Sequence, residues 1–268
     1  MLWLDGEPLA AGAGLDRALE FGDGLFETIA VRDNRPRLLV RHLARLALGC
    51  ERLGIAPQDP AVLKAEIARA ARIPGVGVLK LIVSRGAGGR GYAADPLAPS
   101  RRWLALLTPR PRPARYAVDG VAVCTLTTRL AEQPLLAGIK HLNRLEQVLA
   151  RRELDAASFA EGLMLDISGR VICGTMSNVY ALIEGRVVTP SLARAGVEGV
   201  MRAALLDAWR AAGTEVVVRD LWPTELAGAS ELLLSNALIG VWPVASLDGR
   251  PYAPGPVTRT AATWVESW

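Results

Sequence analysis

One segment of the chain, TPRPRPARY at residues 108–116, limits the fold more than any other. Its three prolines lack the backbone N–H group that a helix interior or a central strand requires. Segments rich in proline are typical of extended linkers between domains. We therefore predict an N-terminal domain over residues 1–109, a linker over residues 110–117 and a C-terminal domain over residues 118–268.

The N-terminal part has the pattern of a mixed α/β domain. Two short β-prone runs, GLFETIAV and RLLV, flank the turn-forming RDNRP and predict a hairpin. Apolar residues at three- and four-residue spacing predict a helix that starts near Leu39 and stops at Gly54. Pro60 lies near the start of a second predicted helix, over about residues 60–72. VGVLKLIVSRG and RRWLALLTP predict two more strands around the loop GAGGRGYAADPLAPS.

The C-terminal part contains more predicted strands than helices. Helices are predicted after Lys140 and over about residues 199–212, and short Gly-bearing turns such as ISGR and IEGR join the strands. This pattern favours a compact, barrel-like α/β domain over a doubly wound parallel sheet. The predicted strands are GVAVCTLTT, EGLMLDIS, RVIC, NVYALIEG, EVVVRD, ELLLSN and GVWPV.

Composition excludes several classes of function. The formal net charge is +4, but the charges are interspersed without a run of five or six of one sign, so we expect no nucleic-acid or membrane partner. The N-terminus lacks the pattern of a signal peptide, and no apolar run approaches the roughly 18 residues of a membrane span. The 3 cysteines are widely spaced without a CxxC pair, which argues against a disulfide framework or a zinc site. We expect a cytoplasmic protein with reduced thiols and no metal.

Lys140 is the first candidate for chemistry. It lies beside His141 and close to Arg144, in the segment LLAGIKHLNRLEQVLARREL. A lysine amine can bond covalently to a carbonyl cofactor, and it acts as a nucleophile or base when burial or neighbouring cations lower its pKa. A single lysine before a helix is more often a solvated surface residue, so the position alone leaves both interpretations open.

Two glycine-rich segments are candidates for binding anions. Gly196 and Gly199 lead into an amphipathic helix whose first free N–H groups, near Val200 and Met201, can face a phosphate. In SRGAGGRGY, Arg90 can hold a carboxylate through two hydrogen bonds. An ordinary turn and a mobile surface loop are the respective alternatives. Neither segment is a GxGxxG fingerprint or a Walker loop.

Taken together, seven segments resemble one known family. The chain is similar to the aminodeoxychorismate lyases, members of the branched-chain aminotransferase-like, fold-type IV group of pyridoxal-phosphate enzymes. The resemblance spans nearly the whole chain, and GIKHLNRLEQ is its most specific part. It implies a homodimer, with a smaller N-terminal α/β domain and a larger, barrel-like C-terminal domain in each subunit. The segments are FGDGLFET, RHLARL, VSRGAGGRGY, LAGIKHLNRLEQVLARREL, GTMSNVY, GVEGVMR and LSNALIGVWPV.

The resemblance assigns a cofactor and residues that hold it. Lys140 would hold pyridoxal 5′-phosphate covalently and later shuttle protons. The phosphate would lie against Arg45 and the helix start at Val200 and Met201, which agrees with the anion site inferred from the glycines. Asn236 would lie near the cofactor and the substrate.

The substrate side is assigned in the same way. Arg90 would bind a substrate carboxylate, with Asn236 as a nearby polar contact. Thr28 would line the substrate side of the cofactor and take part in catalysis. The substrate implied by the resemblance is 4-amino-4-deoxychorismate, which these lyases convert to 4-aminobenzoate and pyruvate on the route to folate.

One position departs from the family pattern. A glutamate normally stands five residues before the Asn of SNVY and pairs with the pyridine nitrogen, but here that position is Cys173. A thiol is a poor hydrogen-bond partner and a poor source of negative charge near neutral pH. Two alternatives to the lyase therefore stay open: a D- or branched-chain aminotransferase of the same fold, and a pyridoxal-phosphate-binding homologue with little or no turnover.

Overall fold

The computed structural model describes residues 3–4, 7–8, 15–109, 111–154 and 159–268. The chain divides into two compact units. The first unit is Met1–Thr108 together with Lys140–Asn143, and the second is Pro109–Ile139 together with Arg144–Trp268. The short helix α4, Arg115–Val118, begins in the predicted linker and ends one residue beyond it.

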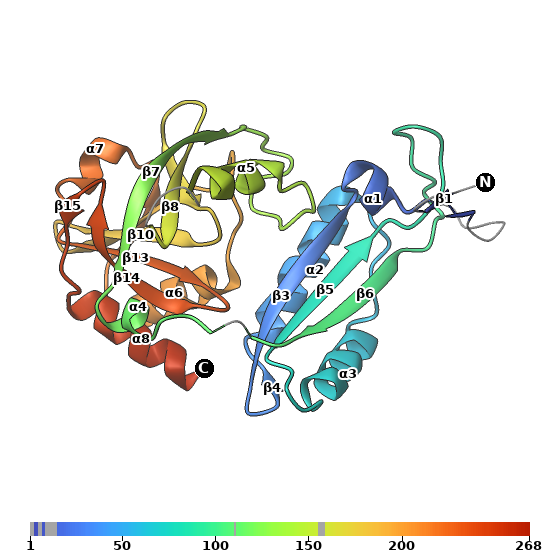
Figure 1. Ribbon diagram of the computed structural model, residues 1–268, viewed down its shortest axis with the longest axis horizontal. Coiled ribbons are helices and arrows are strands. Elements are labelled where there is room, and N and C mark those ends of the chain that lie inside the picture. The colour runs from blue at the N-terminus through green and yellow to red at the C-terminus, as the bar shows by residue number, and fades with distance from the viewer. Residues whose placement is uncertain (1–2, 5–6, 9–14, 110, 155–158) are drawn as a thin grey trace. The chain divides into compact units, whose positions relative to one another are not determined.

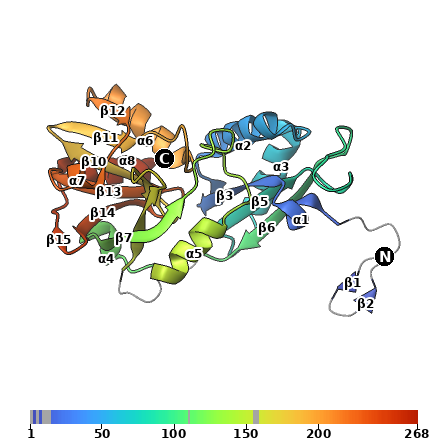
Figure 2. The same cartoon turned by 90° about the horizontal axis from the view of Figure 1, so that it is seen from above.

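The first unit is built on a four-stranded antiparallel sheet in the order β4-β3-β5-β6. A separate antiparallel pair, β1 and β2, precedes it in the chain. Figures 1 and 2 show helix α2 running along one face of the sheet. The elements are β1 (Trp3–Leu4), β2 (Glu7–Pro8), α1 (Arg17–Phe21), β3 (Gly24–Arg32), β4 (Arg35–Pro36), α2 (Leu39–Leu53), α3 (Pro60–Ala71), β5 (Val78–Ser84) and β6 (Arg101–Leu107).

Strand β3 packs one of its faces against helix α2. Successive side chains of a strand point to opposite faces, so Leu25, Glu27 and Ile29 share the face that α2 covers. Gly49 of α2 lets that helix approach the strand closely, because a Cβ atom there would lie 2.8 Å from the Leu25 side chain. Both predicted helices are confirmed, and α2 ends at Gly54 in the left-handed conformation, with φ 62°.

The predicted hairpin is only half correct. GLFETIAV lies in β3 and is confirmed, but the strand predicted over RLLV is wrong. Only Arg35 and Pro36 pair with β3, and the left-handed conformation of Leu38, with φ 52°, turns the chain into α2. Leu39 and Val40 are therefore helical.

The second unit has one large mixed sheet in the order β12-β11-β10-β13-β14-β7-β8-β9, with β15 beside β14. Three pairs are parallel, β11 with β12, β14 with β7 and β7 with β8, and the others are antiparallel. Helices α4 (Arg115–Val118), α5 (Leu145–Leu154), α6 (Val200–Ala211), α7 (Pro223–Leu226) and α8 (Pro256–Ser267) accompany it. The strands are β7 (Val121–Leu130), β8 (Glu161–Asp166), β9 (Val171–Gly174), β10 (Asn178–Ile183), β11 (Arg186–Pro190), β12 (Val216–Arg219), β13 (Glu231–Asn236), β14 (Gly240–Leu247) and β15 (Arg250–Pro251).

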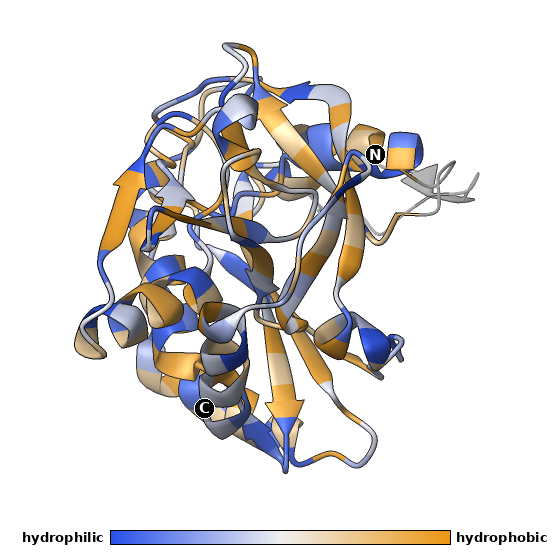
Figure 3. Ribbon diagram, turned by 90° about the vertical axis from the view of Figure 1, so that its left-hand side faces the viewer, coloured by the Kyte–Doolittle hydropathy of each residue, from blue (hydrophilic) through white to orange (hydrophobic). Residues whose placement is uncertain are grey.

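This mixed, curled sheet confirms the prediction of a barrel-like α/β domain rather than a doubly wound one. The predicted IEGR turn is present between β10 and β11, where Glu184 and Gly185 both have positive φ, as a two-residue hairpin turn requires. In Figure 3 the strands carry the most hydrophobic colours, while the helices show both. The buried core side chains include Val121, Val123, Leu163, Val179, Leu234 and Trp242.

Helix α8 is the largest element that the sequence patterns do not predict. Its sequence, PVTRTAATWVES, contains three threonines and two valines, which weaken the helical signal. The structure supplies what the local sequence lacks. The buried Glu231 carboxylate of β13 accepts hydrogen bonds from the N–H groups of Val257 and Thr258 and from the Thr258 hydroxyl, at 3.2, 2.9 and 2.7 Å.

Cys50, Cys124 and Cys173 are all free thiols. Among the described residues, no helix combines the length and the apolar character that a bilayer span needs.

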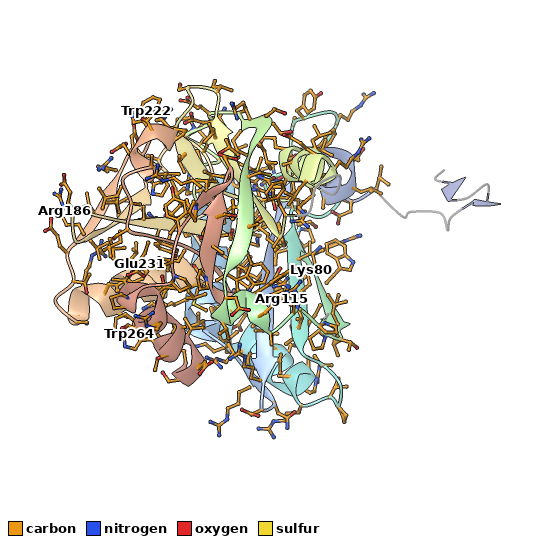
Figure 4. The ribbon with its side chains drawn as sticks, turned by 60° about the vertical axis from the view of Figure 1, so that its left-hand side comes forward. Lys80, Arg115, Arg186, Trp222, Glu231 and Trp264 are labelled. Carbon is orange, nitrogen blue, oxygen red and sulfur yellow. The ribbon has the colours of Figure 1, made fainter. Side chains whose placement is uncertain are left out.

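We expect Glu231→Ala to lower the free energy of unfolding by about 1 to 2 kcal/mol, because it removes the acceptor of the first free N–H groups of α8. Figure 4 shows Glu231 near the helix that carries Trp264. Chemical denaturation measures the effect, with the exposed Glu266→Ala of the same helix as the control. Equal stability of the two variants would contradict this role of Glu231.

Candidate active site

Lys140 lies on a short segment that pairs with strand β3. The N–H of Phe26 donates to the Lys140 carbonyl at 3.0 Å, and the N–H of Leu142 donates to the Gly24 carbonyl at 2.9 Å. His141 forms an antiparallel bridge with Leu25 between these two hydrogen bonds. Backbone pairing on both sides of the bridge fixes the position of the lysine along the strand.

Strand β3 requires a glycine at position 24, where it pairs with β5. A Cβ atom on Gly24 would lie 2.6 Å from the Val83 carbonyl oxygen and 2.8 Å from Cδ1 of Leu142. The first of these contacts is to the backbone of β5, which a rotamer change cannot relieve. The glycine of FGDGLFET therefore permits the close pairing of β3 with β5, beside the segment that carries Lys140.

The Lys140 ammonium lies over an aromatic ring. Its Nζ atom is 4.2 Å from the ring centroid of Phe26, a distance at which a cation is attracted to the ring. The Nζ atom of Lys80, labelled in Figure 4, is 5.3 Å from the same centroid. Thr28 is two residues beyond Phe26, on the same face of β3, and pairs with Lys80 in the sheet register. Two amines and a hydroxyl-bearing residue thus gather on one face of the sheet.

Arg45 belongs to a buried cluster on the other side of β3. Its Nε donates to Glu27 at 2.8 Å, a second guanidinium nitrogen pairs with the same carboxylate, and His42 Nδ1 lies 2.6 Å from it. Glu27 and His42 are at most 1% exposed. Burial opposes the ionisation of Glu27, but hydrogen bonds from His42 and Arg45 outweigh it and hold the pKa of this carboxyl below its ordinary value. The phosphate contact of Arg45 stays a prediction.

Arg90 lies at the surface of the first unit, in the connection between β5 and β6. Four glycines of this connection, Gly86, Gly88, Gly89 and Gly91, have positive φ angles. An exposed guanidinium on such a loop has the chemistry of a carboxylate-binding group, and this role stays a prediction.

In the second unit, helix α6 begins as the anion-site prediction requires. Its N-cap is Gly199, which offers no side-chain acceptor to the first N–H groups of the helix. Val200 and Met201 are each 4% exposed, so those groups lie away from bulk water. Buried N–H groups at the start of a 12-residue helix suit a phosphate.

The segment before α6 is held in place by the segment before Lys140. The Gly138 N–H donates to the Gly196 carbonyl at 3.0 Å, and the Glu198 N–H donates to the Gly138 carbonyl at 2.8 Å. Ile139, 1% exposed, immediately precedes Lys140 in the chain. Asn178 adds a third contact, since its Nδ2 donates to the Val197 carbonyl at 3.0 Å.

Cys173 is on β9, opposite Met164 of β8, and is 6% exposed. Burial raises the pKa of the thiol to about 12, with a further increase from the Glu161 carboxylate and an opposing effect of Arg144. The side chain is therefore an uncharged thiol at neutral pH. Apolar neighbours in its cluster include Leu126, Met164 and Ile172.

Glu161 is a buried residue of this region that sequence reasoning did not single out. Its carboxylate accepts hydrogen bonds from the N–H groups of Gly162, Thr175 and Met176 and from the hydroxyls of Thr175 and Ser177. These contacts hold the GTMSN turn against β8. The available signal was a glutamate directly before the apolar run of EGLMLDIS.

Asn236, at the end of β13, has protein partners for both ends of its amide. Nδ2 donates to the Met176 carbonyl at 3.0 Å, and Oδ1 accepts from the N–H groups of Leu238 and Ile239 at 2.8 and 2.9 Å. These contacts give it a structural role at the same turn. Its contacts with cofactor and substrate stay predictions.

Comparison with known proteins assigns the family. A model of the amino-transferase class IV family matches residues 24–247. The chain belongs to this family. It is 35% identical over 252 residues to an aminodeoxychorismate lyase from Vibrio harveyi, which covers 92% of each chain. It is 49% identical to the crystal structure of 4-amino-4-deoxychorismate lyase from Pseudomonas aeruginosa, with a TM-score of 0.91 over 99% of this chain and 98% of the other.

A further solved structure bears on the cofactor. A hypothetical aminotransferase from Mycobacterium tuberculosis in its PLP-bound form is 26% identical, with a TM-score of 0.78 over 98% of this chain and 96% of the other. Pyridoxal phosphate is therefore the expected cofactor. The resemblance seen in the sequence and the fold-type IV architecture it implied are confirmed.

We expect Glu27→Gln to destabilise the protein by about 3 kcal/mol at neutral pH, because it removes the buried carboxylate charge that pairs with Arg45. The pKa of Glu27 is lowered in the folded state, so its contribution is fully present above the ordinary glutamate value of 4.5. The difference from the parent protein should shrink as the pH falls through the lower, folded-state pKa. Urea denaturation against pH measures it, with the exposed Glu51→Gln as the control. A difference that does not depend on pH would contradict the ion pair.

Proposed function

We propose that this protein is an aminodeoxychorismate lyase that converts 4-amino-4-deoxychorismate to 4-aminobenzoate and pyruvate. The observation that carries this function is the similarity to lyases of that name along nearly the entire chain, at 35% and 49% identity. The product leads to folate, and we place the enzyme in the cytoplasm as a homodimer. The aminotransferase alternative has no better support among the relatives.

The residues present suit pyridoxal phosphate at two of three points. Buried N–H groups at the start of α6 suit its phosphate, and the Lys140 amine suits its aldehyde. The uncharged thiol of Cys173 does not suit a protonated pyridine nitrogen. When bound, the cofactor supplies an electron sink for the carbon that bears the substrate amine.

Lys140 is the group we assign to proton transfer. We propose that its amine removes the proton from the amine-bearing ring carbon of the substrate and later returns a proton to the departing pyruvate. Its backbone pairing with Phe26 fixes the position of the main chain from which the amine extends. Loss of the enolpyruvyl group leaves an aromatic ring, so the elimination is driven by the product itself.

The other residues bind and orient. Thr28 shares the sheet face of Phe26 and is assigned to the substrate side. Arg90 is assigned to a substrate carboxylate, because an arginine binds a carboxylate through two parallel hydrogen bonds. Arg45 is assigned to the phosphate, in addition to its pairing with Glu27.

One assay tests the function directly. Purified protein with pyridoxal phosphate is given enzymatically generated aminodeoxychorismate, and 4-aminobenzoate and pyruvate are followed together. Equal amounts of both products support the lyase. Amine transfer that depends on an added keto acid, without 4-aminobenzoate, would instead support an aminotransferase, and a yellow but inert protein would support a binding homologue.

We expect Lys140→Ala to abolish the visible absorbance of the covalently bound cofactor and to reduce lyase turnover to background. The matched control is Lys64→Ala, which removes an exposed lysine of α3. The control should keep both the absorbance and the turnover. If Lys140→Ala kept either one, the assignment of this lysine would be wrong.

We expect Cys173→Glu to change the dependence of the cofactor absorption spectrum on pH, because a carboxylate stabilises a protonated pyridine nitrogen and an uncharged thiol does not. A stronger electron sink should raise aminotransferase side activity at least as much as lyase activity. Cys173→Ser serves as the uncharged control. Identical spectra and identical activity ratios in parent and Cys173→Glu proteins would contradict a position of Cys173 beside the nitrogen.

A further inference from the structure

We propose that Arg17 is a positioning residue that fixes the conformation of the loop carrying Arg90. The fixed loop would hold the Arg90 guanidinium where it can bind a substrate carboxylate. This inference rests on the function proposed for Arg90. It concerns residues 86–100, which connect β5 to β6.

The Arg17 side chain hydrogen-bonds to three consecutive carbonyl groups directly after Arg90. Its guanidinium donates to Gly91 at 3.1 Å, to Tyr92 at 3.1 Å and to Ala93 at 3.4 Å. The residue is 4% exposed. Buried charge-assisted hydrogen bonds are stronger than those at a wet surface, so this group strongly constrains the path of the loop.

The part of the loop around Arg90 is rich in glycine. Gly88, Gly89 and Gly91 all have positive φ angles and surround Arg90 in sequence. Glycine leaves more backbone conformations accessible than any other residue, so a segment with three of them is flexible unless outside contacts hold it. Among the described residues, Arg17 provides the side-chain hydrogen bonds to Gly91, Tyr92 and Ala93.

Arg17 shares the carboxylate of Asp23 with Arg85. The carboxylate accepts from Arg17 Nε at 2.9 Å and from Arg85 Nε at 2.7 Å. Burial opposes ionisation of Asp23, but hydrogen bonds from Arg85 and Arg17 hold its pKa below the ordinary value. The pair therefore stays charged at neutral pH and does not depend on the substrate.

Aromatic rings add further contacts between α1 and the loop. The Arg17 guanidinium lies 4.9 Å from the ring centroid of Phe21, and that ring meets the Tyr92 ring edge to face at 5.4 Å. Two residues of helix α1 thus contact the loop: Arg17 donates to three of its carbonyl groups, and the Phe21 ring packs against Tyr92. The beginning of the loop is held separately, by the Arg17 N–H donating to Gly86 at 2.9 Å and by a bridge between Asp16 and Ala87.

Limited trypsin digestion tests the loop without any reference to catalysis. Cleavage after Arg90, identified by mass spectrometry, needs residues 88–93 to unfold locally. We expect Arg17→Gln to speed this cleavage about tenfold and Arg17→Lys to give an intermediate rate. The control is Arg85→Gln, which also removes a partner of Asp23 but no bond to residues 91–93. An unchanged rate in Arg17→Gln, or an equal increase in the control, would overturn the proposal.

A double-mutant cycle tests the connection to the substrate. We expect Arg17→Gln to raise KM for aminodeoxychorismate about tenfold, which is about 1.4 kcal/mol, while kcat changes less than about twofold. In an Arg90→Ala background the same change should have no further effect on KM, because Arg17 acts through Arg90. Additive effects on KM would overturn this role.

The two experiments separate the inference from the proposed function. If the parent protein has no lyase activity, the proposed function fails, and the digestion rates still decide whether Arg17 holds the loop. If the lyase is active but Arg17→Gln changes neither the digestion nor KM, the function stands and the inference fails. Cofactor absorbance should be the same in the parent protein and in Arg17→Gln, which excludes a general loss of the fold.

Discussion

The hydrogen bond from the Phe26 N–H to the Lys140 carbonyl, with its neighbour from Leu142 to Gly24, sets the geometry on which the candidate chemistry depends. Through these bonds the main chain around Lys140 pairs with β3 as a short antiparallel strand would. The ring of Phe26 then lies under the ammonium group, at 4.2 Å. Side-chain freedom is thereby reduced at the one amine to which the family chemistry is assigned.

Successive side chains of β3 point to opposite faces of the sheet, and the two faces carry different groups. Phe26 and Thr28 point to the face of Lys140, whereas Glu27 points toward α2 and holds His42 and Arg45. The residue proposed for the substrate side, Thr28, and the buried carboxylate Glu27 therefore lie on opposite faces of one strand. In the second unit, the buried Glu161 carboxylate has a comparable structural role, since it accepts hydrogen bonds from the backbone N–H groups of the turn that precedes Asn178.

Much of the fold could be predicted from local patterns, because helix periodicity, Gly54 and the glycine turns act over a few residues. The sequence RLLV is compatible with a strand and with the start of a helix, because leucine and valine occur in both. The left-handed turn at Leu38, which directs the chain into α2, is not visible in this local pattern. Helix α8 was missed because its cap, Glu231, comes from 25 residues earlier in the chain than Pro256. The candidate residues themselves came from a family resemblance. No local pattern could show that Arg17 meets Gly91, since contacts between distant residues appear only in the folded chain.

The buried thiols have a consequence for the chemical durability of the protein. Burial raises the pKa of Cys50 to about 11 and that of Cys173 to about 12. Oxidants attack the thiolate, which is a minor form of both buried thiols at neutral pH. The same protonation prevents this sulfur from acting as a nucleophile toward an aldehyde. If pyridoxal phosphate binds as proposed, its aldehyde therefore meets a protonated, weakly reactive sulfur at position 173.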